Sequence, residues 1–212
     1  MNKTLITIAC IVGVLLILIV PTCSSYNGMV EKEQNVEQKW AAVQTQYQRR
    51  LDLIPNLVNT VKGYAQHEST TLQNVTNARA GIPAPQPAAV PSDSAMMAAY
   101  DKALAAGQSG SEDAVMKAQQ QLQRQAGLYI NAVHEAYPDL KANENFMGLQ
   151  DELTGTENRI NFARQEYTQA VNDYNVKIRR FPANIVAGLF GFERKQQYEA
   201  EEEAAKAPSV QF

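Results

Sequence analysis

Ionisable and amide side chains crowd two stretches of this sequence in which apolar residues recur at helical spacing. The candidate site residues are Arg50, Asp52, Asn56, His67 and Glu68 in the first stretch, and Glu157, Arg159 and Arg164 in the second. Such groups could recognise a partner, bind a small ligand or transfer protons. We favour a different interpretation, a network of interhelical ion pairs and amide contacts that fixes helix register, because buried polar groups in helical bundles commonly do this.

The spacing of these residues does not match the motifs of known metal or catalytic sites. His67-Glu68 has no second histidine four residues later, and the sequence has no Glu-x-x-His motif, so the zinc and di-iron patterns are not met. There is also no glycine-rich phosphate loop after a predicted strand and no serine in a nucleophile elbow. We therefore expect no metal, no cofactor and no enzymatic activity.

Composition and charge are those of one ordinary domain with a distinct N-terminal segment. The chain has 212 residues, of which 45% are hydrophobic and 19% charged, enough for one domain with its own core. The formal charge is −3 and no basic run exceeds two residues, so we expect no nucleic-acid partner. Both cysteines, Cys10 and Cys23, lie in or beside the N-terminal segment, so packing alone must hold the rest.

Residues 5–20 form an apolar run without charge, preceded by Lys3. With its flanks the run reaches about 20 residues, the length of helix that crosses about 30 Å of hydrocarbon. We predict a membrane anchor within residues 1–25, inserted in the lipid bilayer through residues 5–20, and the preceding positive charge favours a domain on the outer side. A lipoprotein signal with Cys23 as the lipidated residue and a cleaved signal peptide remain as alternatives.

A long amphipathic helix is predicted over residues 26–78. Its apolar residues step by three and four positions, which places them on one side of a helix: Met29, Val36, Trp40, Val43, Tyr47, Leu51, Ile54, Val58, Val61, Ala65, Leu72 and Val75. Pro55 lacks an amide hydrogen and collides with the preceding turn, so we expect a kink or a restart near residues 51–54.

Two more helical tracts have the same spacing. One follows Ser111 and stops before Pro138, and the other begins at Asn143 and continues to Phe181. The tract at residues 26–78 and the tract that begins at Asn143 each contain two successive four-residue steps in their apolar stripe. This match suggests that these two helices lie side by side. We therefore predict an all-α fold, an elongated antiparallel up-and-down helical bundle with an N-terminal transmembrane helix.

The bundle domain should span residues 26–206, with a tail at 207–212 and a Pro/Ala-rich insert at 81–110. Four prolines between residues 83 and 91 predict an extended connector, followed by a short helix over residues 95–106. Near the other end, residues 182–192 are almost wholly apolar. They could contact the bilayer, but we favour the interpretation that they cover one end of the bundle.

Several of these motifs resemble the LemA family. They include the run from Arg49 to Val58 with His67-Glu68, Tyr137 to Ala142, Glu157 to Ile160, and the tail Pro208 to Phe212. The resemblance covers nearly everything outside the anchor and the insert. It implies a bacterial single-pass membrane protein with an antiparallel helical bundle and a poorly defined molecular activity. Early descriptions of the family place the domain inside, against the charge bias.

From this we expect a membrane-anchored scaffold or adaptor of the bacterial cell envelope that acts by protein–protein or membrane contacts. Its partners would be the lipid bilayer, an unknown envelope protein and further copies of the chain as a homo-oligomer. The alternative is an envelope sensor or small-ligand-binding module that uses the polar groups near Pro55.

Overall fold

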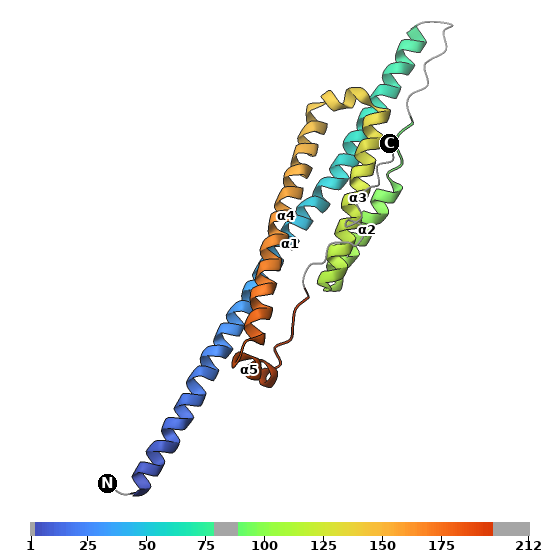
Figure 1. The fold of residues 1–212 in the computed structure, drawn as a ribbon. Coiled ribbons are helices and arrows are strands. Elements are labelled where there is room, and N and C mark those ends of the chain that lie inside the picture. Colours follow the sequence, from blue (N-terminus) through green and yellow to red (C-terminus); the bar gives the residue numbers. More distant parts are fainter. Residues whose placement is uncertain (1–2, 79–88, 197–212) are drawn as a thin grey trace, which may run out of the picture. The chain divides into compact units, whose positions relative to one another are not determined.

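The computed structural model describes the backbone of residues 3–78 and 89–196, with the side chains of 3–12, 14–19 and 76–78 also outside the description. The described residues form five α-helices and one short 3₁₀ helix, in the order α1 (Lys3–Ala78), α2 (Ser94–Ser109), α3 (Glu112–Ala136), η1 (Pro138–Ala142), α4 (Glu144–Arg179) and α5 (Ala183–Phe190) (Figure 1). None of the described residues lies in a strand. The predicted all-α class is confirmed.

The N-terminal part of α1 includes the predicted anchor. Residues 5–20 have a helical backbone, but apart from Gly13 and Val20 their side chains lie outside the described residues. Within the part of the chain that the structure describes, no helix combines the length and apolar character needed to cross a bilayer. The connector at residues 79–88 and the tail at 207–212 also lie outside the described residues.

Helix boundaries follow the capping signals in the sequence. The Ser111 hydroxyl accepts a hydrogen bond from the Ala114 amide at 3.4 Å, and α3 ends one residue before Tyr137-Pro138. The Asn143 side chain accepts from the Phe146 amide at 3.2 Å and starts α4. These side-chain oxygens satisfy amides that have no partner within the first helical turn.

The short helix after the connector is longer than predicted. α2 covers Ser94–Ser109 and ends at Gly110, whose φ of 72° lies in the left-handed region that only glycine adopts readily. α1 passes Pro55 as one helix, so the restart expected near residues 51–54 does not occur. The kink remains a prediction.

The chain divides into two compact units, each with its own packing. Unit 1 comprises residues 1–43 and 161–212, and unit 2 comprises residues 44–160. In unit 1, Lys39 pairs with Glu166 at 2.9 Å and Lys32 pairs with Asp173 at 3.7 Å. Because the partner numbers fall as the α1 numbers rise, α1 and α4 are antiparallel in this unit.

Unit 2 has a core built from α1, α2, α3, η1 and α4. Its largest apolar members include Ile54, Leu57, Leu122, Leu140 and Phe146, all fully buried. α2 and α3 are joined only by Gly110 and Ser111, and they pack against each other along the chain reversal. Short connections of this kind make neighbouring helices antiparallel.

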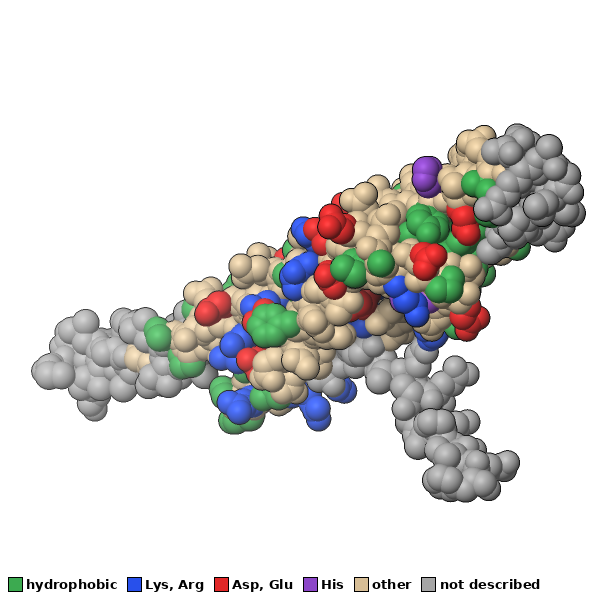
Figure 2. Space-filling view, turned by 90° about the horizontal axis from the view of Figure 1, so that it is seen from above, with side chains coloured by type: hydrophobic (Ala, Val, Ile, Leu, Met, Phe, Trp, Pro, Cys, Tyr) green, Lys and Arg blue, Asp and Glu red, His purple; other side chains and the backbone are tan. Residues whose placement is uncertain are grey.

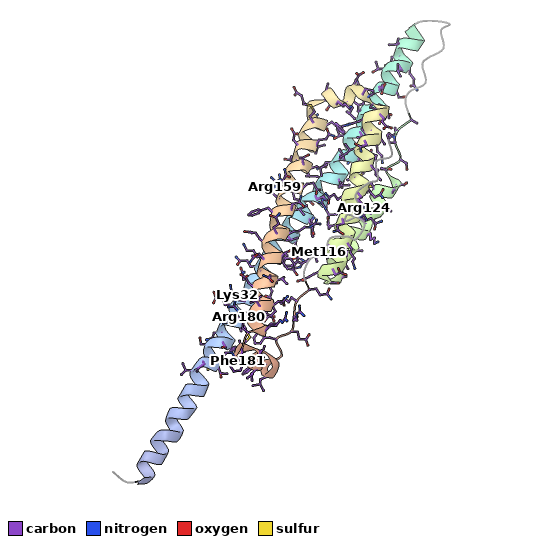
Figure 3. The ribbon with its side chains drawn as sticks, viewed as in Figure 1. Lys32, Met116, Arg124, Arg159, Arg180 and Phe181 are labelled. Carbon is purple, nitrogen blue, oxygen red and sulfur yellow. The ribbon has the colours of Figure 1, made fainter. Side chains whose placement is uncertain are left out.

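The predicted apolar stripes are buried over most of their length. Every α1 stripe residue from Met29 to Ala65 is buried, but Val75 is 44% exposed because α1 extends beyond Ala65, the last α1 residue in the unit 2 core. Phe181 is 82% exposed, since α4 ends at Arg179 and the chain has already left the stripe (Figure 3). Val75 and Phe181, the last apolar positions of their predicted tracts, are therefore not buried, and α4 ends two residues before the predicted end.

Surface charge is mixed. On the face drawn in Figure 2, basic and acidic side chains are interspersed rather than gathered by sign. Such a face offers no extended basic patch of the kind that binds a phosphate backbone.

Candidate functional site

Arg50 is the most deeply buried ionisable side chain of the predicted set. It is 1% exposed, and its Nη1 donates to the backbone oxygen of Gln119 at 3.0 Å and to the Gln119 side-chain oxygen at 3.1 Å. Its Nη2 donates to Glu157 Oε2 at 2.6 Å, and its guanidinium carbon lies 5.9 Å from the ring centroid of Tyr47. The Arg50 side chain thus connects α1, α3 and α4 within unit 2.

This arrangement supplies what a buried guanidinium requires. A charge removed from water is tolerated when it has a counter-ion and hydrogen-bond acceptors, and Glu157 and Gln119 provide both. Gln119 is not among the predicted site residues, although it stands at an apolar-stripe position of α3. A polar residue at such a position is the sequence signal for a buried polar partner.

Asp52, Asn56 and His67 lie outside this network. All three side chains are exposed: Asp52 accepts from Gln48 Nε2 at 2.9 Å, and Asn56 donates to the Asp52 backbone oxygen at 3.2 Å. At His67 it is the backbone oxygen that accepts from the Thr71 hydroxyl, at 2.9 Å. These contacts are local to α1, so this part of the set does not converge on a common point.

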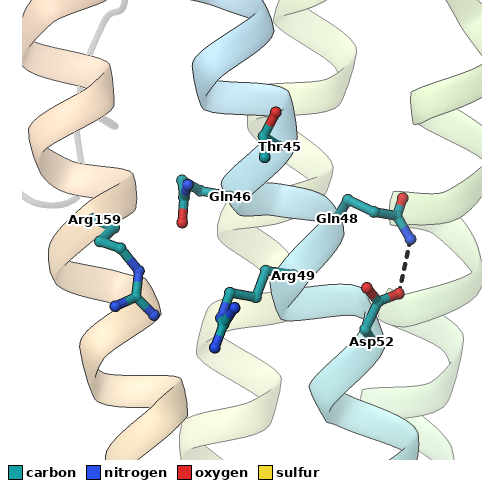
Figure 4. Close-up of a pocket in the computed structure, with 6 residues that line it drawn as sticks. All are labelled: Thr45, Gln46, Gln48, Arg49, Asp52 and Arg159. Atoms are coloured by element: carbon teal, nitrogen blue, oxygen red, sulfur yellow. Dashed lines mark hydrogen bonds between the residues drawn. The ribbon is translucent and has the colours of Figure 1, made fainter.

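An open groove lies beside the Arg50 network in unit 2 (Figure 4). It has a volume of about 660 Å³ and is lined by Thr45, Gln46, Gln48, Arg49, Asp52 and Arg159. Arg49 lies 3.5 Å from Glu152 Oε1, and Arg159 donates to the Thr156 hydroxyl at 3.1 Å. The groove therefore presents two guanidinium groups and one carboxylate, all on exposed side chains.

Glu68 belongs to a different place in unit 2, a cluster of tyrosines. Its Oε2 is buried without a hydrogen-bond partner among the described residues. The Tyr64 and Tyr137 rings are 5.9 Å apart, and burial raises the pKa of both, with the Glu68 charge adding to the rise. Raising a phenol's pKa disfavours its anion, so these tyrosines serve as neutral packing residues.

Tyr129 shows the largest shift in this cluster. Burial, followed by the charge of Asp93, raises the pKa of Tyr129 to about 12, and its hydroxyl has no hydrogen-bond partner within the described residues. A tyrosine proton that is retained in the fold but lost from the unfolded chain couples stability to pH.

The Tyr129→Phe variant should therefore flatten the alkaline limb of the stability profile. The folded pKa is raised above the unfolded value of 10.0, so the parent loses stability as pH rises through 10 towards about 12. Denaturant unfolding between pH 7 and pH 12 measures this, and at pH 7 the variant should differ from the parent by no more than about 1 kcal/mol. An unchanged alkaline limb would contradict the assignment to Tyr129.

Arg164 lies in unit 1, apart from the other candidate residues. It is 8% exposed, and its backbone oxygen accepts from the Thr168 hydroxyl at 2.9 Å. Among the described residues, no group of three or more His, Cys, Asp or Glu side chains is arranged to hold a metal ion. The eight predicted residues are thus spread over a buried network, an open groove, a tyrosine cluster, exposed positions of α1 and a separate unit.

A surface that the site prediction did not include lies at α5. Its smaller side chains, Ala183, Val186 and Ala187, are buried in unit 1. The larger ones point outward, and together with the preceding phenylalanine they form what we call the α5 face: Phe181 (82% exposed), Ile185 (55%), Leu189 (76%) and Phe190 (58%). α5 therefore covers the end of unit 1 with one side and presents apolar side chains to solvent with the other.

Aromatic contacts hold α5 against α1. The Tyr26 ring lies 5.0 Å from Phe190 and 5.6 Å from Phe192, between centroids. Two residues further along α1, the Lys177 side chain lies over Gly28, where an added Cβ would come within 3.2 Å of it. Gly28 thus leaves room for the end of the Lys177 side chain, which comes from α4.

The segment after α5 is fastened to α4 by Asn175. This asparagine is 6% exposed, and its amide donates to the Lys195 backbone oxygen at 2.9 Å while its side-chain oxygen accepts from the Lys195 amide at 3.1 Å. Lys195 also pairs with Glu33 of α1 at 3.4 Å. Gly191, with φ 77°, makes the turn between α5 and this segment.

Replacing Asn175 by alanine should release the segment after α5. Because two hydrogen bonds are lost from a buried position, we expect the free energy of unfolding to fall by about 1–3 kcal/mol. Amide exchange at residues 192–196 should accelerate more than exchange in the middle of α4. Asn172→Ala is the matched control, since Asn172 is exposed on the same helix, and equal exchange in both variants would contradict the clamp.

Comparisons with known proteins find similar sequences over most of the chain. The sequence profile of the LemA family matches residues 39–212. Magnetosome proteins MamQ 1 and MamQ 2 of Paramagnetospirillum magneticum are each 25% identical over 187 residues, which is 87% of this chain and 68% of each relative. Magnetosome protein MamQ of Magnetospirillum gryphiswaldense is 24% identical over 190 residues, with the same coverage.

Proposed function

The chain belongs to the LemA family, and we propose that it is a membrane-associated scaffold or adaptor protein of the bacterial cell envelope. In this proposal the N-terminal run at residues 5–20 holds the chain in the bilayer as a single-pass anchor. The helical domain then offers surfaces to the membrane and to protein partners, and it performs no enzymatic reaction.

The α5 face is the observation that carries the proposal. Scattered exposed apolar residues are ordinary, whereas large apolar side chains gathered on one short helix mark a contact surface. The most deeply buried charge, by contrast, is used within the bundle: Arg50 is paired with Glu157 and with Gln119 of a third helix. The buried charge of the family's polar run is thus used within the bundle, whereas the large exposed apolar side chains are found at α5.

The similar proteins support the proposed setting. Three of them are named magnetosome proteins, and the match covers 87% of this chain. For this chain we propose only that it works at a bacterial membrane.

Membrane fractionation and thiol cross-linking test the proposal together. The chain should sediment with membranes and resist high salt, and deletion of residues 1–25 should weaken this association. Cys23 is exposed and free, so a short bifunctional maleimide applied to native membranes should join Cys23 to a second copy or to a partner. Cys23→Ser is the control. A chain that stays in the soluble fraction, or remains uncross-linked at every expression level, would contradict the scaffold.

A second candidate function, a sensor or small-ligand module, is favoured by the groove beside Arg50. Its two exposed guanidinium groups, Arg49 and Arg159, suit a small dicarboxylate or phosphate ligand. Thermal unfolding with inorganic phosphate or succinate would reveal such binding. A rise in melting temperature that disappears in Arg159→Ala would support the sensor, and no rise in the parent would count against it.

A further inference from the structure

We propose that the α5 face, together with the arginines beside it, docks on the anionic headgroup surface of a phospholipid bilayer. This inference rests on the proposed membrane association. It adds which face of unit 1 meets the lipid and which lipid charge that face selects.

The first step of the argument is the arrangement of apolar side chains. Ile185 and Leu189 are four residues apart and therefore lie on the same side of α5. Phe190 adjoins them, and Phe181 precedes the helix at the end of α4, where Figure 3 labels it next to Arg180. All four are more than half exposed, so an apolar layer could cover them without unpacking unit 1.

The second step is charge. Between residues 177 and 195 the sequence has five cations and one acid, although the whole chain carries a formal charge of −3. The cations are Lys177, Arg179, Arg180, Arg194 and Lys195, and the acid is Glu193. Arg179, Arg180 and Arg194 are exposed, and none of them forms an ion pair with another described residue. Apolar side chains flanked by arginines are typical of helices that lie in the interface of an anionic membrane.

The third step is position, which favours lipid over an acidic protein surface. Tyr26 contacts both Phe190 and Phe192, and it follows Val20, the last residue of the uncharged run, by six positions of continuous helix. Six helical residues rise about 9 Å, close to the depth of a headgroup layer. If residues 5–20 cross the bilayer, the α5 face lies at the level of the headgroups.

Site-specific fluorescence in proteoliposomes tests the docking directly. The full chain carrying Leu189→Trp is reconstituted in phosphatidylcholine vesicles with or without phosphatidylglycerol, each containing lipids brominated on their acyl chains. We expect the emission of the tryptophan introduced at position 189 to be blue-shifted and quenched, more strongly with phosphatidylglycerol. Phe162→Trp is the matched control, because Phe162 is 63% exposed on α4 of the same unit, and its emission should be unaffected. Trp40 is present in all variants, so its emission is removed by subtracting the spectrum of the parent chain.

The arginines are tested on the same reporter. Substituting Arg179, Arg180 and Arg194 with glutamine should lower the ratio of docked to undocked chain by about five-fold for each arginine at low salt. High salt should have the same effect on the parent, because it screens surface charge. Removing three cations elsewhere, with Lys102→Gln, Lys117→Gln and Lys141→Gln, should leave docking within about two-fold of the parent, since none of these lysines belongs to the α5 face or to the residues that flank it.

The outcomes separate this inference from the proposed function. If the chain fails to float with either kind of vesicle in a density gradient, both the docking and the proposed membrane association are overturned. A chain that floats with both, while the tryptophans of Leu189→Trp and Ile185→Trp remain unquenched, overturns the docking alone. Equal quenching in both vesicle types overturns the selectivity for anionic lipid. A blue shift of the introduced tryptophan's emission that occurs only in native membranes, which contain protein, would assign the α5 face to a protein partner and overturn the docking on lipid.

Discussion

Arg50→Ala is expected to lower the free energy of unfolding by about 3–5 kcal/mol, the cost of removing one partner from a buried ion pair. The Arg50 side chain is 1% exposed, and its loss would leave the Glu157 carboxylate and the Gln119 side-chain oxygen without their donor. Urea unfolding of the purified chain, followed by far-ultraviolet circular dichroism, measures this change.

The neighbouring arginine provides the matched control. Arg49 and Glu152 are each 51% exposed and 3.5 Å apart, so Arg49→Ala should cost less than about 1 kcal/mol. A double substitution, Arg50→Met with Glu157→Leu, should recover much of the lost stability, because apolar replacement of a whole buried pair is often neutral. If Arg50→Ala cost no more than Arg49→Ala, Arg50 would not be a structural residue.

Trp40→Ala is expected to have a comparable effect in unit 1, lowering the free energy of unfolding by about 3–5 kcal/mol. The Trp40 side chain is 9% exposed, and its ring lies 5.3 Å from that of Tyr167 on α4. Truncation to alanine leaves a cavity where α1 and α4 meet, and the packed helices can close it only in part. Unfolding followed by far-ultraviolet circular dichroism measures the loss without relying on the tryptophan signal.

The control for this variant is Phe162→Ala. Phe162 is a 63% exposed aromatic residue on α4, so its truncation should change stability by less than about 0.5 kcal/mol. Hydrogen exchange adds a local readout: in Trp40→Ala, amides of residues 29–43 and 163–178 should lose more protection than those of α2 and α3. Equal loss everywhere would mean that the two units unfold as one.

The elements of the fold could be predicted because local rules decide them. Ser111 and Asn143 begin helices through side-chain caps, Pro138 ends one, and the stripe from Met29 to Ala65 has the spacing of a buried helix face. Each of these signals acts within a few residues, so a single sequence contains it.

The register between helices could not be predicted in the same way. The four-four steps at residues 43–51 and 163–171 suggested a shared register for α1 and α4, yet Tyr167 packs against Trp40, seven residues before Tyr47. Which residues face each other depends on packing across helices and on long-range pairs such as Arg50 with Glu157. Periodicity identifies the face of a helix but leaves its offset along the axis undetermined.

The arrangement of the candidate site residues could not be derived from the sequence. Arg50 and Glu157 meet as an ion pair, but Asp52, Asn56 and His67 remain exposed, and Arg164 lies in the other unit. Residue type shows that a side chain is polar, while its partner depends on tertiary placement. The α5 face could not be predicted for a related reason, because residues 182–192 are almost uniformly apolar in sequence. Only the structure shows that the alanines are buried while Ile185, Leu189 and Phe190 are exposed.

The central claim is that the family's polar run holds the helices together while α5 makes the outside contacts. A photo-activatable benzoylphenylalanine placed at position 189 or at position 52 of the full chain in living cells tests it most directly, since both side chains are exposed. We predict adducts with lipid from position 189 and only background labelling from position 52. Efficient labelling of a ligand or protein from position 52, with none from position 189, would contradict the account and favour the sensor.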